Sequence, residues 1–209
     1  MALIDERGKS IITELDLRDV KAGDTLRIDE TARLTPLAQD LLQQRGIQIE
    51  RARRGSARRR YKIALGSDHG GFKMKEELKR VLAELGHDFQ DFGCFSTDAV
   101  DYPDYAHTVA RAVARKTCDV GIMIDGAGIG SCMAANKVPG VRAAMCYDEA
   151  TARNSREHNG ANVLTLGGTM ISNDVMKKIV SVWLETELTE DRHKRRVAKI
   201  DAIAEEYCR

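Results

Sequence analysis

Residues 123–137 read "MIDGAGIGSCMAANK", and this stretch decides the fold. An apolar segment ends at Asp125, a glycine-rich turn follows, and a helical segment begins after the turn. This order is typical of strand-turn-helix units, in which the N–H groups of the turn and of the first helical residues bind anions. A carboxylate at the mouth of such a turn repels an anion unless it has a chemical role. The sequence therefore predicts a site here and singles out Asp125.

Apolar runs like the one before Asp125 recur along the C-terminal part of the chain. They lie at residues 62–66, 119–125, 141–147 and 162–168, with a weaker one at 87–93. Amphipathic segments separate them, and the clearest has apolar residues at positions 78, 81, 82 and 85 and ends at Gly86. This alternation predicts an α/β fold with a parallel sheet of about five strands flanked by helices on both faces.

A basic stretch divides the chain into two parts. Residues 51–60, "RARRGSARRR", hold six arginines and no apolar residue larger than alanine, which predicts an exposed linker. Nucleic-acid binding is disfavoured because no aromatic residue is interleaved to stack on bases. We therefore expect a small module over residues 1–50 and a larger domain over residues 61–209.

The small module is predicted to be α+β. Residues 24–29 and 47–50 have the pattern of strands, and residues 35–46 that of a short helix. Thr35 is placed to cap this helix, Pro36 occupies its first position and Gly46 ends it. Large apolar residues are few, so we expect little independent stability and a need for a partner surface.

Composition excludes several classes of protein. The chain has 209 residues and a net charge of +1, which gives no general attraction to nucleic acid or to anionic membranes. It has no apolar run of the roughly 20 residues that span a bilayer, and its start lacks the pattern of a signal peptide, so we expect a cytoplasmic protein. The five cysteines form no Cys-x-x-Cys pair, so neither a disulfide framework nor a zinc site is indicated.

Polar residues collect where the predicted strands end. Asp68 and His69 follow the first strand, Asp125 and "GAGIG" follow residues 119–124, and His158 and Asn159 come near the end of a later helix. Ligands of parallel sheets bind at the carboxyl ends of strands. Each feature alone has a plain explanation: a capping or surface histidine, a packing glycine, or, for residues 192–196 with their arginines, a solvated helix face. Together they supply the acid-base groups, backbone N–H groups and guanidinium groups that a phosphorylated carbonyl compound requires.

The same residues carry a family resemblance. The segments "ALGSDHGGFKMKEEL", "DFGCFSTDAVDYPDYA", "GAGIGSCMAANKVPGVRAAMCYD", "SREHNGANVLTLGG" and "RHKRRVAKI" follow one another between residue 61 and the end. This part of the chain resembles the ribose-5-phosphate isomerase B family, which includes the galactose-6-phosphate isomerase subunits. The resemblance implies a Rossmann-like fold, a homodimer or dimer of dimers, no metal or other cofactor, and interconversion of aldose and ketose phosphates.

The resemblance also implies roles for individual residues. His158 opens the sugar ring as acid or base, while Asp125 stands where many relatives have a cysteine base. The turn supplies N–H groups that stabilise an enediolate, and two arginines hold the phosphate, in the site of the neighbouring subunit. The implied substrate-binding residues are Asp68, His69, Tyr102, Gly126, Gly128, Gly130, Asn136, Asn159, Arg192 and Arg196.

Departures from the family pattern keep alternatives open. Asp125 replaces the cysteine, and Ser131 stands where another branch has a glutamate base; Ala127 and Thr169 replace a hydroxyl residue and an arginine. We expect a pentose-phosphate isomerase in which Asp125 is the base. In the alternatives, Asp125 only caps the next helix, the altered pocket takes another sugar, or the protein binds sugar phosphates without catalysis.

The small module has a resemblance of its own. Residues 32–50, "ARLTPLAQDLLQQRGIQIE", resemble short segments attached to enzymes of bacterial microcompartments. This implies a shell or cargo partner bound through residues 1–50 and a location inside such a compartment. The alternative is an extension that stabilises a dimer.

Overall fold

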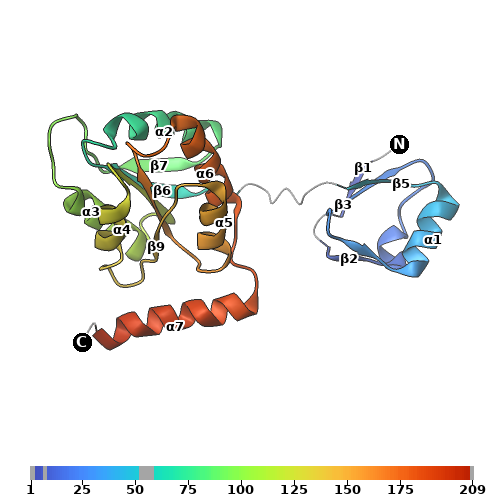
Figure 1. The fold of residues 1–209 in the computed structure, drawn as a ribbon. Helices are drawn as coiled ribbons and strands as arrows, with labels where there is room; N and C mark the ends of the chain where they lie inside the picture. Colours follow the sequence, from blue (N-terminus) through green and yellow to red (C-terminus); the bar gives the residue numbers. More distant parts are fainter. Residues whose placement is uncertain (1–2, 7–8, 52–58, 208–209) are drawn as a thin grey trace. The chain divides into compact units, whose positions relative to one another are not determined.

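The computed structural model describes residues 3–6, 9–51 and 59–207, which form two compact units, Met1–Arg58 and Arg59–Arg209 (Figure 1). Most of the predicted linker, residues 52–58, lies outside the described residues. Each unit has its own β-structure and its own core of buried apolar side chains. Every helix in the described part of the chain is too short or too polar to cross a membrane.

The larger unit is built on a parallel sheet of five strands in the order β7-β6-β8-β10-β9. The strands are β6 (Lys62–Ser67), β7 (Asp88–Asp91), β8 (Val120–Asp125), β9 (Ala143–Met145) and β10 (Val163–Gly167). The central strands are buried on both faces, as their continuous apolar sequences require. The predicted α/β fold with about five parallel strands is confirmed.

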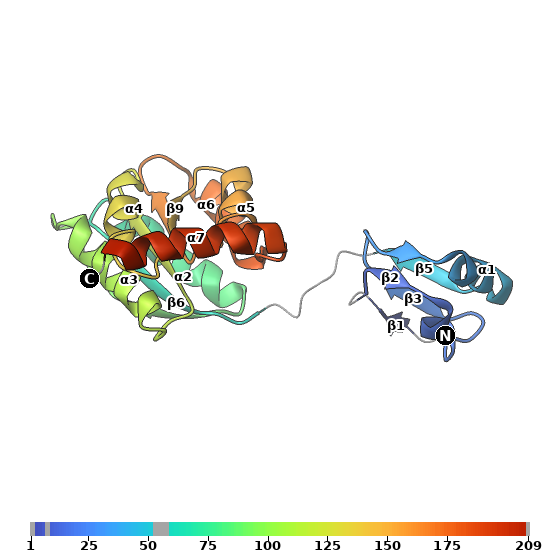
Figure 2. The same ribbon diagram turned by 90° about the horizontal axis from the view of Figure 1, so that it is seen from below.

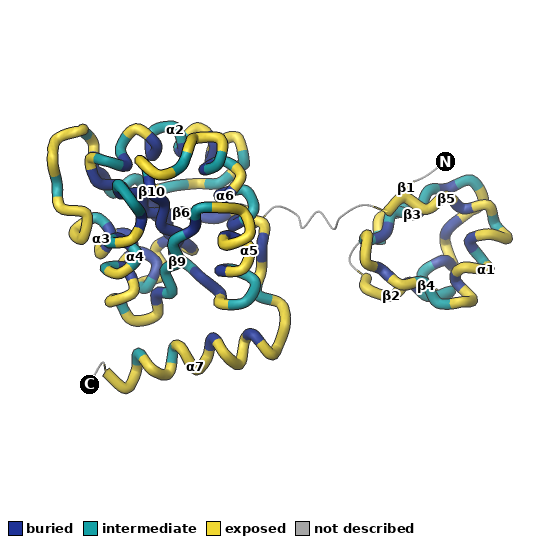
Figure 3. The backbone as a smooth tube through the Cα atoms, in the orientation of Figure 1, coloured by how far each residue is buried: buried dark blue, intermediate teal, exposed yellow. Residues whose placement is uncertain are grey.

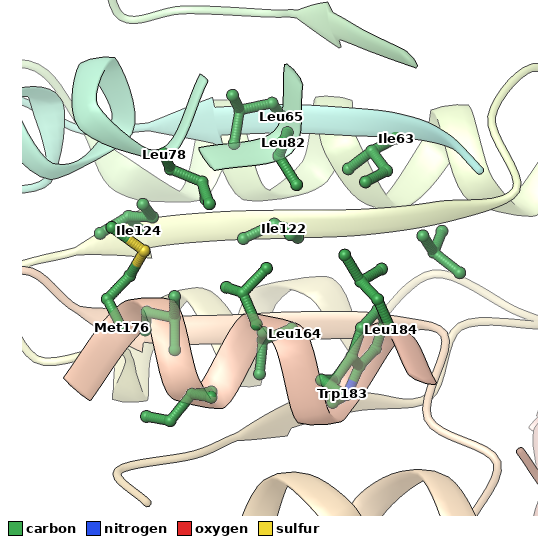
Figure 4. Close-up of a cluster of buried hydrophobic side chains, with 14 of the residues drawn as sticks. Ile63, Leu65, Leu78, Leu82, Ile122, Ile124, Leu164, Met176, Trp183 and Leu184 are labelled. Atoms are coloured by element: carbon green, nitrogen blue, oxygen red, sulfur yellow. The ribbon is translucent and has the colours of Figure 1, made fainter. Parts of the chain in front are cut away.

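Helices cover both faces of this sheet (Figures 1 and 2). They are α2 (Phe72–Glu84), α3 (Tyr102–Ala114), α4 (Ile129–Ala135), α5 (Glu149–Glu157) and α6 (Asn173–Glu185), and a further helix, α7 (Asp191–Tyr207), follows them in the chain. One apolar core joins the sheet to α2, α5 and α6, with Trp183 fully buried in it (Figure 4), and a second core joins the other face to α3 and α4. The last helix, α7, buries only His193 and Val197, and most of its other residues are exposed (Figure 3).

The strand order reverses between β6 and β8, because β6 continues to β7 on one side and pairs with β8 on the other. At such a reversal the loops leave the sheet in opposite directions and open a crevice. Glycines let these loops pack backbone against backbone. A Cβ at Gly71 would lie 2.1 Å from the Ile124 carbonyl oxygen, and one at Gly168 would lie 3.0 Å from the Gly70 oxygen.

The described residues of the smaller unit form two short parallel sheets, one 3-10 helix and one α-helix. The elements are β1 (Leu3–Asp5), β2 (Ile11–Ile12), η1 (Glu14–Leu17), β3 (Thr25–Ile28), β4 (Arg33–Leu34), α1 (Pro36–Arg45) and β5 (Gln48–Arg51). The predicted caps of the helix are confirmed: the Thr35 hydroxyl accepts the Ala38 N–H at 3.2 Å, and Gly46 ends the helix at φ 63°. Apolar residues were expected to be too few for much stability, yet buried residues from Ile12 to Ile47 form a distinct core.

Candidate functional site

Asp125 is the last residue of β8, and its carboxylate is buried against the start of α4. Oδ1 accepts a hydrogen bond from the Gly128 N–H, and Oδ2 accepts two from Ser131, one from its N–H at 2.9 Å and one from its hydroxyl at 2.5 Å. These are the bonds of a residue that caps a helix N-terminus. The side chain therefore occupies one N–H group of the turn and one of the first turn of α4, and the role of Asp125 as a base stays a prediction.

The glycine-rich turn is fixed by hydroxyl groups from neighbouring strand ends. Its three successive carbonyls, at residues 126, 127 and 128, accept hydrogen bonds from Thr169 at 2.6 Å, Tyr147 at 2.7 Å and Thr165 at 2.9 Å. Because a trans peptide directs its N–H away from its C=O, binding the carbonyls orients the N–H groups of the turn. Sequence reasoning did not find these contacts, since they join loops whose order in the sheet it could not give.

Asp68 and His69 lie at the end of β6, next to the reversal of strand order. The buried Asp68 accepts the Gly71 N–H at 2.9 Å, and its own N–H donates to the Ile124 carbonyl at 3.1 Å. His69 is exposed, and its Nδ1 accepts the Val100 N–H at 3.2 Å. Both residues therefore follow the strand end as expected, and their contact with a substrate stays a prediction.

Tyr102, the first residue of α3, covers the first turn of α4. A Cβ at Gly130 would lie 2.5–2.7 Å from three atoms of the Tyr102 ring and hydroxyl, so the ring packs directly on this glycine. The side chain keeps 40% of its surface exposed. This packing explains why residue 130 carries no side chain, and the place of Tyr102 in a pocket wall stays a prediction.

Asn136 is used differently from the expectation. Its amide nitrogen donates to the Ala143 carbonyl at 2.9 Å, and its amide oxygen accepts the Ala143 N–H at 2.8 Å. The side chain thus extends the sheet by pairing with β9 as another strand would. These two hydrogen bonds give Asn136 a role in the fold, and its contact with substrate stays a prediction.

His158 and Asn159 lie at the opposite edge of the sheet from Asp125. Helix α5 starts after β9 and runs back, so it ends where β8 and β10 begin; there the Gly121 N–H donates to the Asn162 carbonyl at 2.9 Å. The six residues of β8 separate the two edges by about 17 Å. The sequence had grouped His158 with the strand-end residues, and the structure corrects this.

The predicted arginines accompany His158 at this amino edge. The rings of His158 and His193 are stacked, with centroids 4.3 Å apart and planes 21° apart, which brings α7 against the end of α5. Arg192 pairs with Glu190, with Nε 2.6 Å from Oε2, and Arg196 is exposed on α7. One chain therefore carries two separate groups of predicted site residues.

The described residues contain no disulfide and no metal-binding cluster. Cys94, Cys118, Cys132 and Cys146 are free, and no group of three or more His, Cys, Asp or Glu side chains is arranged to hold a metal ion there. Burial raises the pKa of the Cys118 and Cys146 thiols, so both are protonated at neutral pH. Cys132 is half-buried beside Asn136.

The sequence model of the ribose/galactose isomerase family matches residues 63–200 of the chain. Ribose-5-phosphate isomerase B of Escherichia coli is 44% identical over 142 residues, which cover 68% of this chain and 95% of that protein. The matched family region lies within the larger unit.

Solved structures of similar proteins have the same fold as the larger unit. Ribose-5-phosphate isomerase B of Clostridium thermocellum is 47% identical with a TM-score of 0.69, covering 70% of this chain and 99% of its own. The Mycoplasma genitalium enzyme, solved with bound ribulose-5-phosphate, is 39% identical with a TM-score of 0.67, covering 69% of this chain and 97% of its own.

Proposed function

Since this chain belongs to the ribose/galactose isomerase family, we propose that it interconverts an aldose phosphate and a ketose phosphate. The proposed substrate is a pentose phosphate of the ribose 5-phosphate and ribulose 5-phosphate type. A base takes the proton from C2 of the open-chain aldose, which gives an enediolate. The proton returns to C1, while the proton of the C2 hydroxyl moves to the oxygen on C1. The reaction needs positioned acid and base groups and N–H donors for the enediolate oxygen.

The observation that carries the proposal is the division of the predicted site residues between two edges of one sheet. Asp68, Asp125 and the turn at 126–130 lie at the carboxyl edge, whereas His158 and the arginines of α7 lie at the amino edge. A single chain cannot close both groups around one small sugar. We propose that two copies pair so that the amino edge of each completes the carboxyl edge of the other.

A groove beside α7 supports such pairing. It has a volume of about 650 Å³ and lies between α7 and the segment that leads into β9. The apolar side chains of Ile200, Ile203 and Tyr207 are exposed along it, and the ion pair of Asp201 with Arg142 at 2.8 Å ties α7 to its own domain there. An exposed apolar row of this kind indicates a contact between proteins, here a homodimer.

The proposed roles follow from this arrangement. His158 of one copy gives a proton to the ring oxygen as the bond between C1 and the ring oxygen breaks, and the C1 hydroxyl passes its proton to a water molecule as the carbonyl forms. Arg192 and Arg196 bind the phosphate. In the other copy, Asp68 and His69 bind sugar oxygens, the N–H groups of the turn face the enediolate, and Asp125 moves the proton between C2 and C1.

A specific observation favours a second candidate, an isomerase for a different sugar. The Thr169 hydroxyl donates to the Gly126 carbonyl at 2.6 Å, so at this position the chain has a turn-fixing hydroxyl and no guanidinium. Loss of one cation from the pocket weakens phosphate binding and favours a substrate held through other contacts.

Incubation of the protein with a panel of aldose phosphates in deuterated water tests both candidates. Deuterium at the carbon next to the carbonyl, in one pentose 5-phosphate only, would support the leading proposal. Deuterium only in another sugar would favour the second candidate. No exchange in any sugar that binds would indicate a non-catalytic sugar-phosphate-binding protein.

For the smaller unit we propose a contact with another protein, and for the whole chain a cytoplasmic location inside a bacterial microcompartment. Leu3, Ile11, Leu15 and Leu37 are each more than half exposed on this unit. A shallow groove of about 490 Å³ lies between α1 and β5, lined in part by Leu34, Leu42, Ile47 and Ile49. These apolar surfaces support a shell or cargo partner.

A further inference from the structure

His193 is a buried histidine whose ring nitrogens have no hydrogen-bond partner among the described residues. Only 4% of its surface is exposed, and the Glu190 carboxylate oxygen lies 3.8 Å from Nε2, beyond hydrogen-bond distance. Buried polar groups without partners are rare and costly. The His193 ring instead stacks on the His158 ring, with the two ring centroids 4.3 Å apart.

Asn154 binds an edge of the His158 ring, and Asn159 in turn binds Asn154. The Asn159 amide nitrogen donates to the side-chain oxygen of Asn154 at 3.3 Å, which assigns that atom as an acceptor. The amide nitrogen of Asn154 then faces Nδ1 of His158 at 2.9 Å. Because an amide nitrogen can only donate, Nδ1 must accept and carries no proton. In the neutral ring the proton is then on Nε2.

We propose that His193 and Asn154 are positioning residues for His158: the His193 ring is a neutral platform under the His158 ring, and Asn154 fixes the His158 proton on Nε2. The inference rests on the proposed function, in which His158 protonates the ring oxygen of the sugar. It adds to that function the reason why His158 presents a proton at one defined nitrogen.

The charges around the stacked rings favour an uncharged His193. Burial lowers the pKa of His193, and the neighbouring His158, Arg192 and Arg196 lower it further, while Glu190 acts in the opposite direction. Two stacked imidazolium ions would repel each other strongly in this setting. A neutral ring under His158 avoids that repulsion and contributes only packing.

This role differs from direct phosphate binding by His193. A phosphate ligand needs an N–H group that reaches the anion, and both ring nitrogens of His193 are inaccessible to solvent. Positioning acts on the catalytic step, so its loss lowers kcat and leaves KM nearly unchanged. Loss of a phosphate contact would raise KM.

The experiment uses the full chain and its variants Asn154→Asp, His193→Phe and His193→Ala, with His107→Ala as the control because His107 is exposed on α3, outside both groups. Nitrogen-15 NMR of the histidine rings reports which nitrogen of His158 is protonated. We expect Nε2–H in the parent and in His193→Phe, and a proton on Nδ1 in Asn154→Asp, because a carboxylate accepts where the amide donated.

Kinetics with the sugar phosphate found by deuterium exchange give the second measurement. We expect kcat to fall about 10- to 100-fold in Asn154→Asp and in His193→Ala, with less than a threefold change in KM, and a smaller fall in His193→Phe, which keeps a stacked ring. The control should match the parent in both constants.

Two outcomes would overturn the inference: an unchanged His158 tautomer in Asn154→Asp, or a rise in KM without a fall in kcat in both His193 variants. The NMR arm is independent of turnover. A parent protein that shows the expected tautomers but isomerises no sugar would reject the proposed function and still support the positioning of His158.

Discussion

The two edges of the larger sheet carry the two groups of site residues in different ways. At the carboxyl edge, Asp125 is buried, and the turn after it is bound through each carbonyl from residue 126 to residue 128. At the amino edge, Asn159, Arg192 and Arg196 are exposed, and α7 buries only His193 and Val197. Hydrogen bonds within one chain thus hold Asp125 and the turn of the first group. The second group lies at the end of α5 and on the mostly exposed α7, and we propose that a second copy covers it.

Replacing the buried carboxylate tests the carboxyl edge most severely. In Asp125→Asn the charge is lost and one acceptor oxygen becomes a donor that faces Ser131 or Gly128. If Asp125 is the base, turnover should fall about 10²- to 10⁴-fold. The lost hydrogen bonds should also lower the free energy of unfolding by about 1–3 kcal/mol. Steady-state kinetics and thermal unfolding measure the two effects.

Ser131→Ala is the matched control for this prediction. It removes one hydroxyl donor to Asp125 and leaves the carboxylate charge in place, so stability should fall by about 1 kcal/mol while turnover falls far less than in Asp125→Asn. Equal turnover in Asp125→Asn and the parent would leave Asp125 as a cap only. The half-buried Cys132 would then be the next residue to test as the base.

Mixed dimers test whether the two edges belong to different copies. A dimer of one Asp125→Asn chain and one His158→Ala chain contains one site with both defects and one intact site, so about half of the parent's activity should return. Arg196 lies on the same edge as His158. Mixing Arg196→Ala with His158→Ala should therefore restore nothing. Activity in tagged, purified mixed dimers is the measurement, and recovery in the second pairing alone would refute the division.

The sequence predicts which residues end a strand, but it does not predict at which edge of the sheet a helix end lies. The five strands follow from the apolar runs, and Asp68 and Asp125 fall at strand ends as expected, because burial and strand position are encoded locally. His158 was misplaced, since the sequence reading followed order along the chain and overlooked that a crossover helix returns to the amino edge.

Contacts between loops could not be predicted from the sequence either. The hydroxyls of Tyr147, Thr165 and Thr169 reach the same turn only because β8, β9 and β10 are neighbours in the order that the fold adopts. Asn136 likewise gained a sheet-pairing role that its place in a helix did not indicate. Such contacts depend on strand order, which local pattern does not determine.

A buried ion pair supports the carboxyl edge and gives the next prediction. The fully buried ammonium of Lys75 contacts both oxygens of Asp91 at 2.7 Å, and Asp91 also accepts the Gly93 N–H at 2.9 Å. Asp91→Asn removes the carboxylate that binds Lys75 through both oxygens and leaves it the partly exposed Glu76 carboxylate, 3.4 Å away, so the free energy of unfolding should fall by about 3–5 kcal/mol at pH 7. Lys177→Ala removes an exposed partner of Glu77 and should cost under about 1 kcal/mol.

The same pair predicts a pH dependence. Burial alone would raise the pKa of Asp91, but hydrogen bonds from Lys75, Lys79 and Gly93 outweigh it and hold the pKa below the ordinary value of 3.8. The stabilisation is therefore present above that pH and is lost as the pH falls through the lower, folded pKa. Denaturant titrations from pH 7 down to pH 3 should show the parent and Asp91→Asn converging. A constant difference would contradict this assignment.

The smallest effect is expected from removing the smaller unit, which contributes no residue to either edge. Deletion of residues 1–58 cuts at the boundary between the units and keeps the contact of Arg60 with Asp88 and the buried Tyr61. Because each unit has its own apolar core, kcat and KM should stay within about twofold of the parent values and the larger unit should keep its unfolding transition.

If the smaller unit recruits a partner, that partner should co-purify with the full chain and be lost from the truncated one. Replacing Leu15 and Leu37 by serine in the full chain separates recruitment from mere chain length, since both side chains are exposed and their loss should leave the unit folded. A large fall in kcat on truncation would show that the smaller unit takes part in the site, and the comparison of the two edges would then have to include it.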